Sequence, residues 1–192
     1  QEDEALEVIV VDSNSSDDSF NQTINDFEEH SIFNFIKLDS NVGFGRSNNL
    51  GYKHASGEYI FLLNPDTQIK TGTLSNLKKY LGSHPNVAAV GPKLVYPDGR
   101  LQPSVRNLPT LYDQIIILTK LHNIFPFLTR KYHQKNFDYE AEGSAQQIMG
   151  AAIFTRKNII DEIGLFDKKF NRNFEEVDWC TRLNAANYQI IF

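Results

Sequence analysis

A short apolar run that ends at a proline constrains the fold of this 192-residue chain more than any other feature. Residues 59–63 read Tyr-Ile-Phe-Leu-Leu, which has the length of a strand and is rich in aromatic and branched side chains. Such a run is typical of a central strand covered on both faces inside an α/β sheet. Asn64, Pro65 and Asp66 follow, and the strand must end there because proline cannot donate to a sheet ladder. The run therefore places a carboxylate at the carboxyl end of a buried strand, where open α/β sheets hold ligands.

The segments around this strand alternate between strand and helix patterns. Residues 6–11 and 33–38 are apolar runs of strand length, and each is followed by a stretch with helical spacing. Alternation at this spacing predicts right-handed crossovers, so we expect an α/β fold with a mostly parallel central sheet, flanking helices and a Rossmann-like N-terminal half. Ser16 is expected to cap the first helix, and residues 146–154 are expected to form one strand with small residues at its centre.

Composition excludes several classes of function. With 41% apolar residues the chain can bury a sizeable core, and one domain over residues 1–192 is the simplest organisation. The formal charge of −5 argues against nucleic acid as a partner, because there is no basic excess to replace counterions. Cys180 is the only cysteine, which excludes an intrachain disulfide and indicates a reducing, cytoplasmic compartment. No apolar run approaches the roughly 18 residues that a transmembrane helix needs.

Polar loops follow three of the predicted strands, and we expect these loops to share a ligand. They begin at Asp12, Asp39 and Asn64, and the carboxyl ends of parallel strands meet at one edge of a sheet. The Gly-x-Gly at residues 43–45 lets the backbone approach a phosphate or ribose, although it is not the full dinucleotide fingerprint. Asp66 is a hard oxygen ligand suited to Mg²⁺ or Mn²⁺. On this stretch alone, an ordinary turn explains Asp66 equally well.

A run of acidic side chains, Glu175-Glu176-Val177-Asp178, opens a later helical pattern. Acidic residues in a first turn favour the helix dipole, and Asp178 with Arg182 is an ordinary ion pair at i,i+4 spacing. The catalytic alternative rests on the irregular loop at residues 171–174, which places both glutamates directly after it. Adjacent helical residues point about 100° apart, so Glu175 and Glu176 cannot both face the same atom.

Several different short motifs follow one another along nearly the whole chain. They are Val10–Asp17, Asn41–Gly45 with Asn49 and Gly51, Leu63–Thr67, Gly91–Leu94 with Asp98 and Gly99, Gly150-Ala151, and Gly164–Asp167 leading into Phe174–Arg182. In this order they resemble the family 2 inverting glycosyltransferases of GT-A fold, particularly the rhamnosyltransferase-like branch. Each motif is weak alone, but the ordered set is specific.

The resemblance implies roles for individual residues. Asn64-Pro65-Asp66 would stand for the family's Asp-x-Asp, with Asp66 on a Mg²⁺ or Mn²⁺ ion. The family's Glu-Asp pair matches Glu175 and Glu176, and its second member is the catalytic base. Here that base is a glutamate, one methylene longer than the usual aspartate. Asp12 would contact the nucleotide base, Gly150 and Ala151 would lie close to the donor sugar, and the donor-binding set would comprise Asp12, Asn14, Asn41, Gly43, Asn49, Asn64, Asp66, Gly150 and Ala151.

The implied activity is metal-dependent transfer of a hexose, rhamnose included, in cell-surface polysaccharide synthesis. The donor would be a nucleoside-diphosphate sugar of the UDP or dTDP type. The acceptor would be a saccharide or lipid-linked hydroxyl, and transfer would invert the anomeric carbon. The alternative is a nucleotide-sugar-binding module without transfer activity. A sugar-phosphate nucleotidylyltransferase is disfavoured, because there is no Gly-rich, basic N-terminal loop.

The resemblance also implies that parts of the family's domain are missing. The family opens with a strand and a helix before the strand that ends at Asp12, and it continues past the final strand near Phe192. We therefore expect residues 1–192 to be a GT-A domain from the middle of a longer enzyme. Without its first strand, such a domain would leave one sheet position empty.

Residues 106–135 combine positive charge with apolar side chains. Five cationic side chains face one carboxylate there, which gives a net charge of +4 in a chain of net −5. One interpretation is a helix packed on the core. The other is that the segment lies on an anionic membrane surface, at the inner face of the membrane, and presents the enzyme to a lipid-linked acceptor.

Overall fold

The computed structural model describes residues 6–170 and 173–192, and residues 59–63 form strand β3 (Tyr59–Leu63) as expected. Ile60 and Leu62 are buried in the main core, while Tyr59 and Phe61 pack against a second cluster on the other face. Both faces of β3 are therefore covered. In the hydrogen-bonded sheet of the described residues, however, β3 is an edge strand rather than a central one.

The largest sheet has the strand order β3-β10-β4-β11-β8. Strand β10 (Ala152–Arg156) runs antiparallel to both β3 and β4 (Val87–Val90), whereas β11 (Gln189–Ile191) runs parallel to β4. β3, β4 and β11 consequently point in one direction, and the α/β class is as expected. The ladder itself is mixed rather than mostly parallel, because β10 lies between two strands of the opposite direction and β8 (Ser144–Ala145) is antiparallel to β11.

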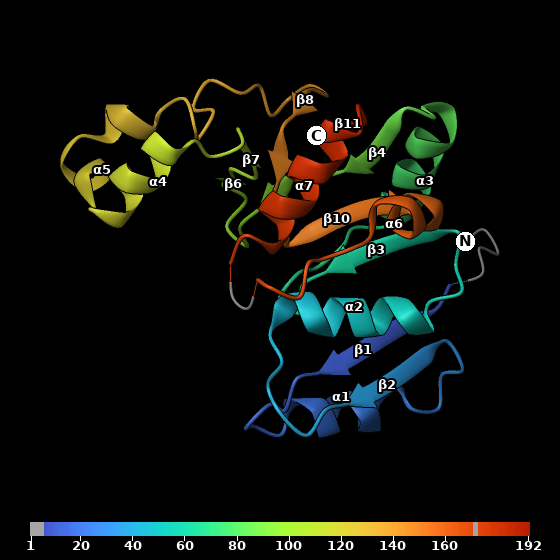
Figure 1. Cartoon of the computed structure of the whole chain (residues 1–192). Helices are drawn as coiled ribbons and strands as arrows, with labels where there is room; N and C mark the ends of the chain where they lie inside the picture. The colour runs from blue at the N-terminus through green and yellow to red at the C-terminus, as the bar shows by residue number, and fades with distance from the viewer. Residues whose placement is uncertain (1–5, 171–172) are drawn as a thin grey trace.

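Two parallel strands and two helices form the N-terminal part of the molecule (Figure 1). β1 (Val8–Asp12) pairs in parallel with β2 (Phe33–Lys37), and α1 (Ser19–Phe27) connects them, which confirms the expected strand–helix–strand order. α2 (Phe44–His54) packs on β1, where Gly51 lies close to the side chain of Val11. Within the described residues no strand pairing joins β1 to β3. The extent of the domain beyond residues 1–192 stays a prediction.

Two local predictions are wrong. α1 begins after Asp18 rather than Ser16, and no side chain caps it. Asp17 accepts a hydrogen bond from the Ser19 amide, and Asp18, the N-cap residue, accepts one from Asn21 Nδ2. Residues 146–154 do not form one strand. They divide into β9 (Gln147–Ile148), a turn at residues 149–151 and the start of β10, because the Gly150-Ala151 pair turns the chain before β10 joins β3.

The remaining elements cover the large sheet and extend from it. α3 (Thr73–Ser83) packs on β4, and α6 (Lys157–Ile163) packs on β10. α7 (Glu175–Ala185) packs on β9 and β11 and buries Trp179 and Leu183 completely. Short strands and helices fill the interval between β4 and β8: β5 (Leu94–Val95), β6 (Leu101–Gln102), β7 (Val105–Arg106), α4 (Leu111–Leu118), α5 (Leu121–Ile124) and the 3-10 helix η1 (Pro126–Thr129).

Candidate active site

The loops that follow β1 and β2 meet, as the sequence predicts. Ser13 Oγ donates to Asn41 Oδ1 at 3.4 Å and accepts from the Val42 amide at 2.9 Å. Asn41 Oδ1 also accepts from the Gly43 amide at 3.0 Å. Gly43 has φ of +83°, a conformation that favours glycine, and from there α2 begins. The result is a short, hydrogen-bonded bridge that leads from the end of β1 to the start of α2.

Asp12 lies at the base of this bridge and is 6% exposed. Its carboxylate accepts hydrogen bonds from the Ser15 amide at 3.0 Å and from Ser15 Oγ at 2.5 Å. The following Asn14 adopts a left-handed conformation with φ of +61° and is exposed. Ser15 thus holds the Asp12 carboxylate in place at the carboxyl end of β1.

A second group of expected site residues comes together at the end of β3. The Asn64 amide donates to the carbonyl oxygen of Ala151 at 2.9 Å, which joins the Asn64–Asp66 turn to the Gly150-Ala151 turn. A Cβ placed on Gly150 would lie 3.5 Å from the ring of Phe44 and 3.8 Å from Cβ of Glu176. Because Phe44 is the first residue of α2, this contact connects the second group to the Asn41–Gly43 bridge.

Glu175 and Glu176 diverge, as their adjacency on a helix requires. Glu175 is 1% exposed, its Cγ lies 3.0 Å from the position of a Cβ on Gly45, and its Oε1 has no hydrogen-bond partner. Glu176 points to the Gly150 side and is only partly buried. Of the two glutamates, only Glu176 is beside the glycine expected at the donor sugar.

Burial raises the pKa of the Glu176 carboxyl above its usual range, and the charge of Glu175 raises it further. A hydrogen bond from its own backbone amide and the positive charge of Arg106 act in the opposite direction and lower that pKa. A carboxylate with a raised pKa is a stronger base than a solvated one, and it is still ionised when the pH exceeds that pKa. The environment therefore suits Glu176 to accept a proton.

Asp66 is exposed, and no hydrogen bond or ion pair engages its carboxylate among the described residues. In the described part of the chain, no group of three or more His, Cys, Asp and Glu side chains could hold a metal ion. Mg²⁺ and Mn²⁺ sites in nucleotide enzymes need only one or two protein carboxylates, because ligand phosphates supply the other oxygens. An unengaged aspartate at a strand end fits that chemistry.

Asn49 has a structural role that differs from the donor contact expected of it. Its Nδ2 donates to the carbonyl oxygen of Phe166 at 2.7 Å, and its Oδ1 accepts from the Phe166 amide at 3.1 Å. Both ends of the amide are engaged with backbone, so Asn49 fixes the 164–167 turn on α2. Asp178 likewise pairs with Arg182 at 2.8 Å, as its i,i+4 spacing predicts, and Arg182 also donates to the carbonyl oxygens of Ile163 and Gly164.

Sequence inspection missed two residues beside Glu176, and it placed a loop partly on residues that the structure does not describe. Phe44 contacts Gly150, and Arg106 is close enough to lower the pKa of Glu176. The only signal for Arg106 was its place in the basic segment 106–135. The irregular loop expected at residues 171–174 lies partly outside the described residues, since 171 and 172 are not among them.

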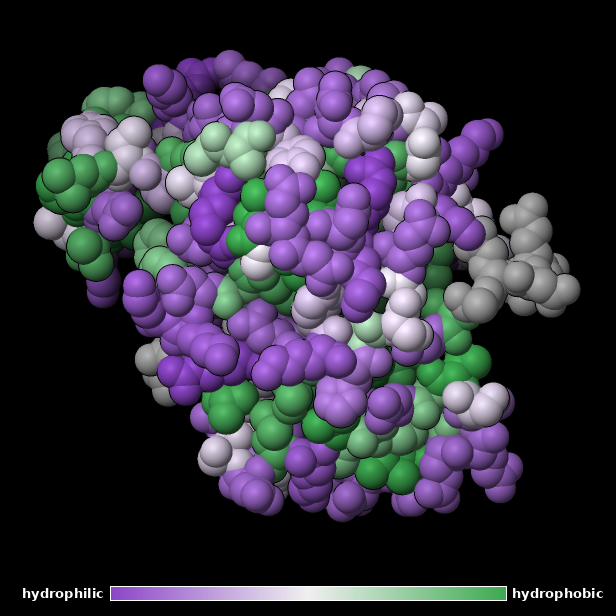
Figure 2. All heavy atoms as spheres, turned by 45° about the vertical axis from the view of Figure 1, so that its right-hand side comes forward, coloured by the Kyte–Doolittle hydropathy of each residue, from purple (hydrophilic) through white to green (hydrophobic). Residues whose placement is uncertain are grey.

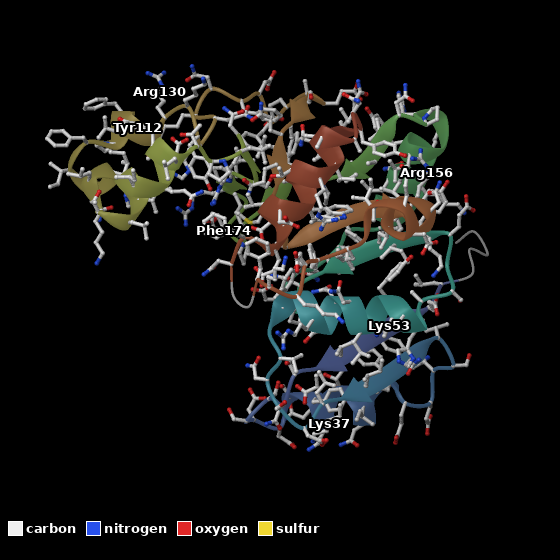
Figure 3. The ribbon with its side chains drawn as sticks, viewed as in Figure 1. Lys37, Lys53, Tyr112, Arg130, Arg156 and Phe174 are labelled. Atoms are coloured by element: carbon white, nitrogen blue, oxygen red, sulfur yellow. The ribbon has the colours of Figure 1, made fainter. Side chains whose placement is uncertain are left out.

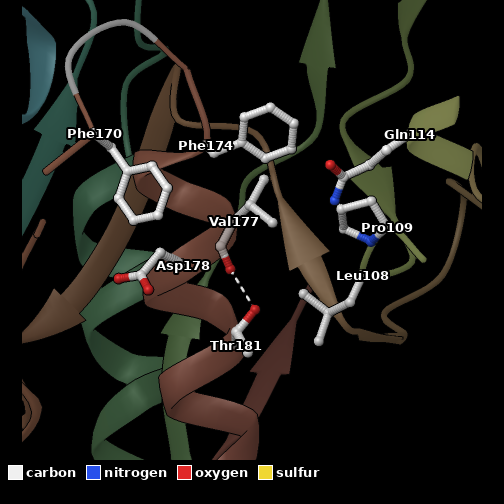
Figure 4. Close-up of a pocket in the computed structure, with 8 residues that line it drawn as sticks. All are labelled: Leu108, Pro109, Gln114, Phe170, Phe174, Val177, Asp178 and Thr181. Atoms are coloured by element: carbon white, nitrogen blue, oxygen red, sulfur yellow. Dashed lines mark hydrogen bonds between the residues drawn. The ribbon is translucent and has the colours of Figure 1, made fainter. Parts of the chain in front are cut away.

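A pocket of about 440 Å³ opens beside α7, on the side of the helix away from the sheet. Phe174 precedes α7 as its N-cap residue and lines the pocket. Figure 3 shows it between the sheet and the segment that carries Tyr112 and Arg130. Figure 4 shows the pocket itself, with Thr181 bonded to the carbonyl oxygen of Val177 at 2.7 Å. The residues that line it are Leu108, Pro109, Gln114, Phe170, Phe174, Val177, Asp178 and Thr181.

A known family model, described as glycosyl transferase family 2, matches residues 1–162. The chain belongs to glycosyl transferase family 2. A curated relative from Mycobacterium tuberculosis, an N-acetylglucosaminyl-diphospho-decaprenol L-rhamnosyltransferase, is 23% identical over 204 residues. That alignment covers 97% of this chain and 64% of the relative, so the chain spans less than two thirds of the relative's length.

Solved glycosyltransferase structures share the fold. The mannosyltransferase PcManGT from Pyrobaculum calidifontis, in complex with GDP-Man and Mn²⁺, matches with a TM-score of 0.62 and 18% identity, over 96% of this chain and 44% of that one. GalNAc-T7 with UDP, GalNAc and Mn²⁺ matches with a TM-score of 0.69 and 10% identity, over 98% and 36%. At these identities the likeness establishes the GT-A fold alone. Among the described residues, no helix has the length and hydropathy to cross a bilayer.

Proposed function

We propose that this family 2 chain transfers a sugar from a nucleoside-diphosphate sugar to an acceptor hydroxyl with inversion at the anomeric carbon. The observation that carries the proposal is the position of Glu176 beside Gly150, in an environment that raises the pKa of its carboxyl. A base with these properties next to the expected sugar position can take the proton of an attacking hydroxyl. The process that we propose is the synthesis of cell-surface polysaccharide, which the names of two further relatives, a poly-beta-1,6-N-acetyl-D-glucosamine synthase and an O-antigen biosynthesis protein, suggest.

The chain's own residues would perform four tasks. Asp12 and the Ser13–Asn41 bridge would hold the nucleoside, and the Asn64–Ala151 contact would fix the turn against which the donor lies. Glu176 would remove the acceptor proton as the hydroxyl attacks from the face opposite the departing diphosphate. General-base assistance of this kind contributes roughly 10²–10⁴ in rate. Asp66, with the donor's phosphates, would hold a divalent ion, which stabilises negative charge on a leaving diphosphate when bound.

The proposal also covers the metal ion, the donor nucleotide, the sugar and the acceptor. Structural neighbours were crystallised with Mn²⁺, which supports a divalent ion at Asp66 but does not choose between Mg²⁺ and Mn²⁺. The relative's name supports rhamnose as the sugar and a lipid-linked saccharide as the acceptor. UDP and dTDP donors are both compatible with Asp12 as the base contact.

A donor panel tests the function. The chain is incubated with UDP- and dTDP-sugars and Mn²⁺, with and without a saccharide acceptor, and release of free nucleoside diphosphate is measured. The proposal predicts turnover of one donor class, including slow hydrolysis when no acceptor is present. Donor binding without any turnover would instead indicate a nucleotide-sugar-binding module.

A further inference from the structure

Helices α4 and α5 and the 3-10 helix η1 form a projection that extends away from the sheet (Figure 1). The three elements, residues 111–129, pack mainly on one another. Thr110 and Asp113 form a capping box at the start of α4, and Asp113 is buried by it. The only carboxylate of the segment is thus buried and accepts hydrogen bonds from the amide and the hydroxyl of Thr110.

The outer surface of this projection is apolar. Of the 17 large hydrophobic side chains exposed in the described residues, eight lie within residues 111–127, so nearly half are concentrated in one short stretch. Leu118 is 80% exposed, Leu111 75% and Ile124 70%. Figure 2 shows hydrophobic atoms gathered at this end of the molecule, on the left. The eight side chains are Leu111, Tyr112, Ile115, Leu118, Leu121, Ile124, Phe125 and Phe127.

Exposed cations border the apolar side chains. Lys120 separates α4 from α5, and Arg130, Lys131 and Lys135 follow η1. None of the four pairs with a carboxylate of the described residues. The net charge of residues 106–135 is +4, whereas the whole chain carries −5. The projection therefore differs from the rest of the protein in both hydropathy and charge.

We propose that this projection docks on an anionic lipid bilayer, with the eight apolar side chains in the headgroup–acyl boundary and the four cations at the lipid phosphates. Apolar side chains bordered by Lys and Arg are the pattern that interfacial membrane segments use. A second copy of the chain fits less well, because a two-fold contact through this surface would bring the unpaired cations of both copies together. A bilayer also requires no matching shape for side chains that come from three differently oriented helices.

The base of the projection lines the pocket beside α7, so docking on a bilayer would bear on which acceptors reach that pocket. Leu108, Pro109 and Gln114 from the base of the projection line the same pocket as Phe174 and Val177, the neighbours of the two glutamates. A lipid-linked acceptor held in the bilayer would bring its saccharide to this pocket, which is lined by the α7 residues that flank the two glutamates in the sequence. This consequence rests on the proposed function, whereas the docking itself does not.

Vesicle flotation of the full chain tests the docking without any catalytic readout. Vesicles of phosphatidylcholine alone are compared with vesicles that contain about 30% phosphatidylglycerol, at low and at high salt. The proposal predicts binding to the anionic vesicles that weakens as salt rises, since exposed charges are screened. Absence of binding to anionic vesicles at low salt would overturn it.

Matched variants locate the contact. Leu118→Ser with Phe127→Ser removes two exposed side chains of the projection, and Ile69→Ser with Tyr96→Ser removes two exposed side chains elsewhere. We expect the first pair to lower the vesicle partition constant by roughly ten-fold or more and the second pair to leave it unchanged. Equal binding by both pairs would overturn the assignment. The unmodified protein could instead form dimers in solution and fail to bind vesicles. If Leu118→Ser with Phe127→Ser then made it monomeric, a second copy of the chain would be what covers this surface.

If the docking holds, the acceptor route is examined with a lipid-linked and a water-soluble acceptor. Loss of transfer to the lipid-linked acceptor alone, in Leu118→Ser with Phe127→Ser, would support the route. Transfer to neither acceptor by the unmodified chain would contradict the proposed function and leave the docking result standing.

Discussion

The Cβ atom of Glu176 lies 3.8 Å from the position that a Cβ would take on Gly150. This contact joins the first turn of α7 to the turn before β10, and the Asn64–Ala151 hydrogen bond extends it to the end of β3. Three segments that are far apart in the sequence thereby meet at one place. The following predictions depend on that arrangement.

Asp66→Asn is expected to remove most metal-dependent nucleotide binding and to leave the fold intact. The side chain is exposed and has no protein partner among the described residues, so its charge can be lost without structural cost. Calorimetry of nucleotide binding with and without Mn²⁺ measures the effect. Asp26→Asn, an exposed aspartate on α1, is the control. Unchanged metal dependence in Asp66→Asn would make this residue an ordinary turn aspartate.

Gly45→Ala is expected to destabilise the protein. The new methyl group would lie 3.0 Å from Cγ of Glu175 and 3.2 Å from Cβ of Phe166. Overpacking costs about 1–3 kcal/mol, which exceeds the gain of about 1 kcal/mol from replacing a helical glycine by alanine. Chemical denaturation measures the difference, and a more stable variant would contradict the packing described here.

Gly150→Ala is expected to behave differently from Gly45→Ala. Its methyl group would meet Phe44 and Glu176 at ordinary contact distances of 3.5 Å and 3.8 Å, so the fold should tolerate it. If the donor sugar lies against Gly150, the methyl group should raise the KM for the donor several-fold. Steady-state kinetics and thermal denaturation separate the two effects. If both the KM for the donor and the stability are unchanged, Gly150 does not contact the donor sugar.

Asn49→Ala tests a structural role against a donor contact. The variant loses both hydrogen bonds to Phe166, and each is worth about 0.5–1.5 kcal/mol, so the free energy of unfolding should fall by about 1–3 kcal/mol. Donor affinity, measured well below the melting temperature, should stay within a factor of about two, since the amide is engaged with backbone. A large loss of donor affinity at full stability would restore Asn49 to the donor site.

The sequence predicted the elements better than their pairing. The apolar run 59–63 matches β3, and the crossover from β1 to β2 is as expected, because hydrophobic spacing determines local structure. The antiparallel place of β10 between β3 and β4 depends on contacts between distant segments, which spacing does not encode. The meeting of the loops that begin at Asp12 and Asp39, seen in the Ser13–Asn41 contact, followed from strand ends alone. The contact of Phe44 with Gly150 did not, because it depends on the direction in which α2 leaves Gly43.

For the exposed projection, too, the sequence predicted one property and not another. Charge and apolar content marked residues 106–135 as unusual, but both a packed helix and a membrane surface agreed with the sequence. The exposure of Leu111, Leu118 and Ile124 favours the surface, because a helix packed on the core would bury them. Exposure depends on the whole fold and is not readable from composition.

The pH dependence of transfer should report the environment of Glu176. Its carboxyl has a pKa above 4.5 in the folded chain, so kcat should rise as the pH rises through that higher pKa and the base becomes ionised. The same shift means that the folded state binds this proton more tightly than the unfolded state. The stability contribution is therefore present at pH below 4.5 and is lost as the pH rises through the folded pKa. Glu176→Gln should remove both dependences, and a kcat that stays level as the pH falls to 4.5 would argue against a carboxylate base.

The central claim is that Glu176 is the base, and turnover of three variants at saturating donor tests it most directly. Glu176→Gln should lose roughly 10²–10⁴ in kcat with donor affinity nearly unchanged, and Glu176→Asp should retain activity because it keeps the carboxylate. Glu175→Gln, beneath Gly45, serves as the adjacent control and should keep its turnover. If Glu176 only complements the helix dipole, Glu176→Gln would cost about 0.3–1 kcal/mol of stability and leave the rate alone. Full turnover in Glu176→Gln would contradict the account, whereas loss in Glu176→Gln with turnover retained in Glu176→Asp and Glu175→Gln is the result that it predicts.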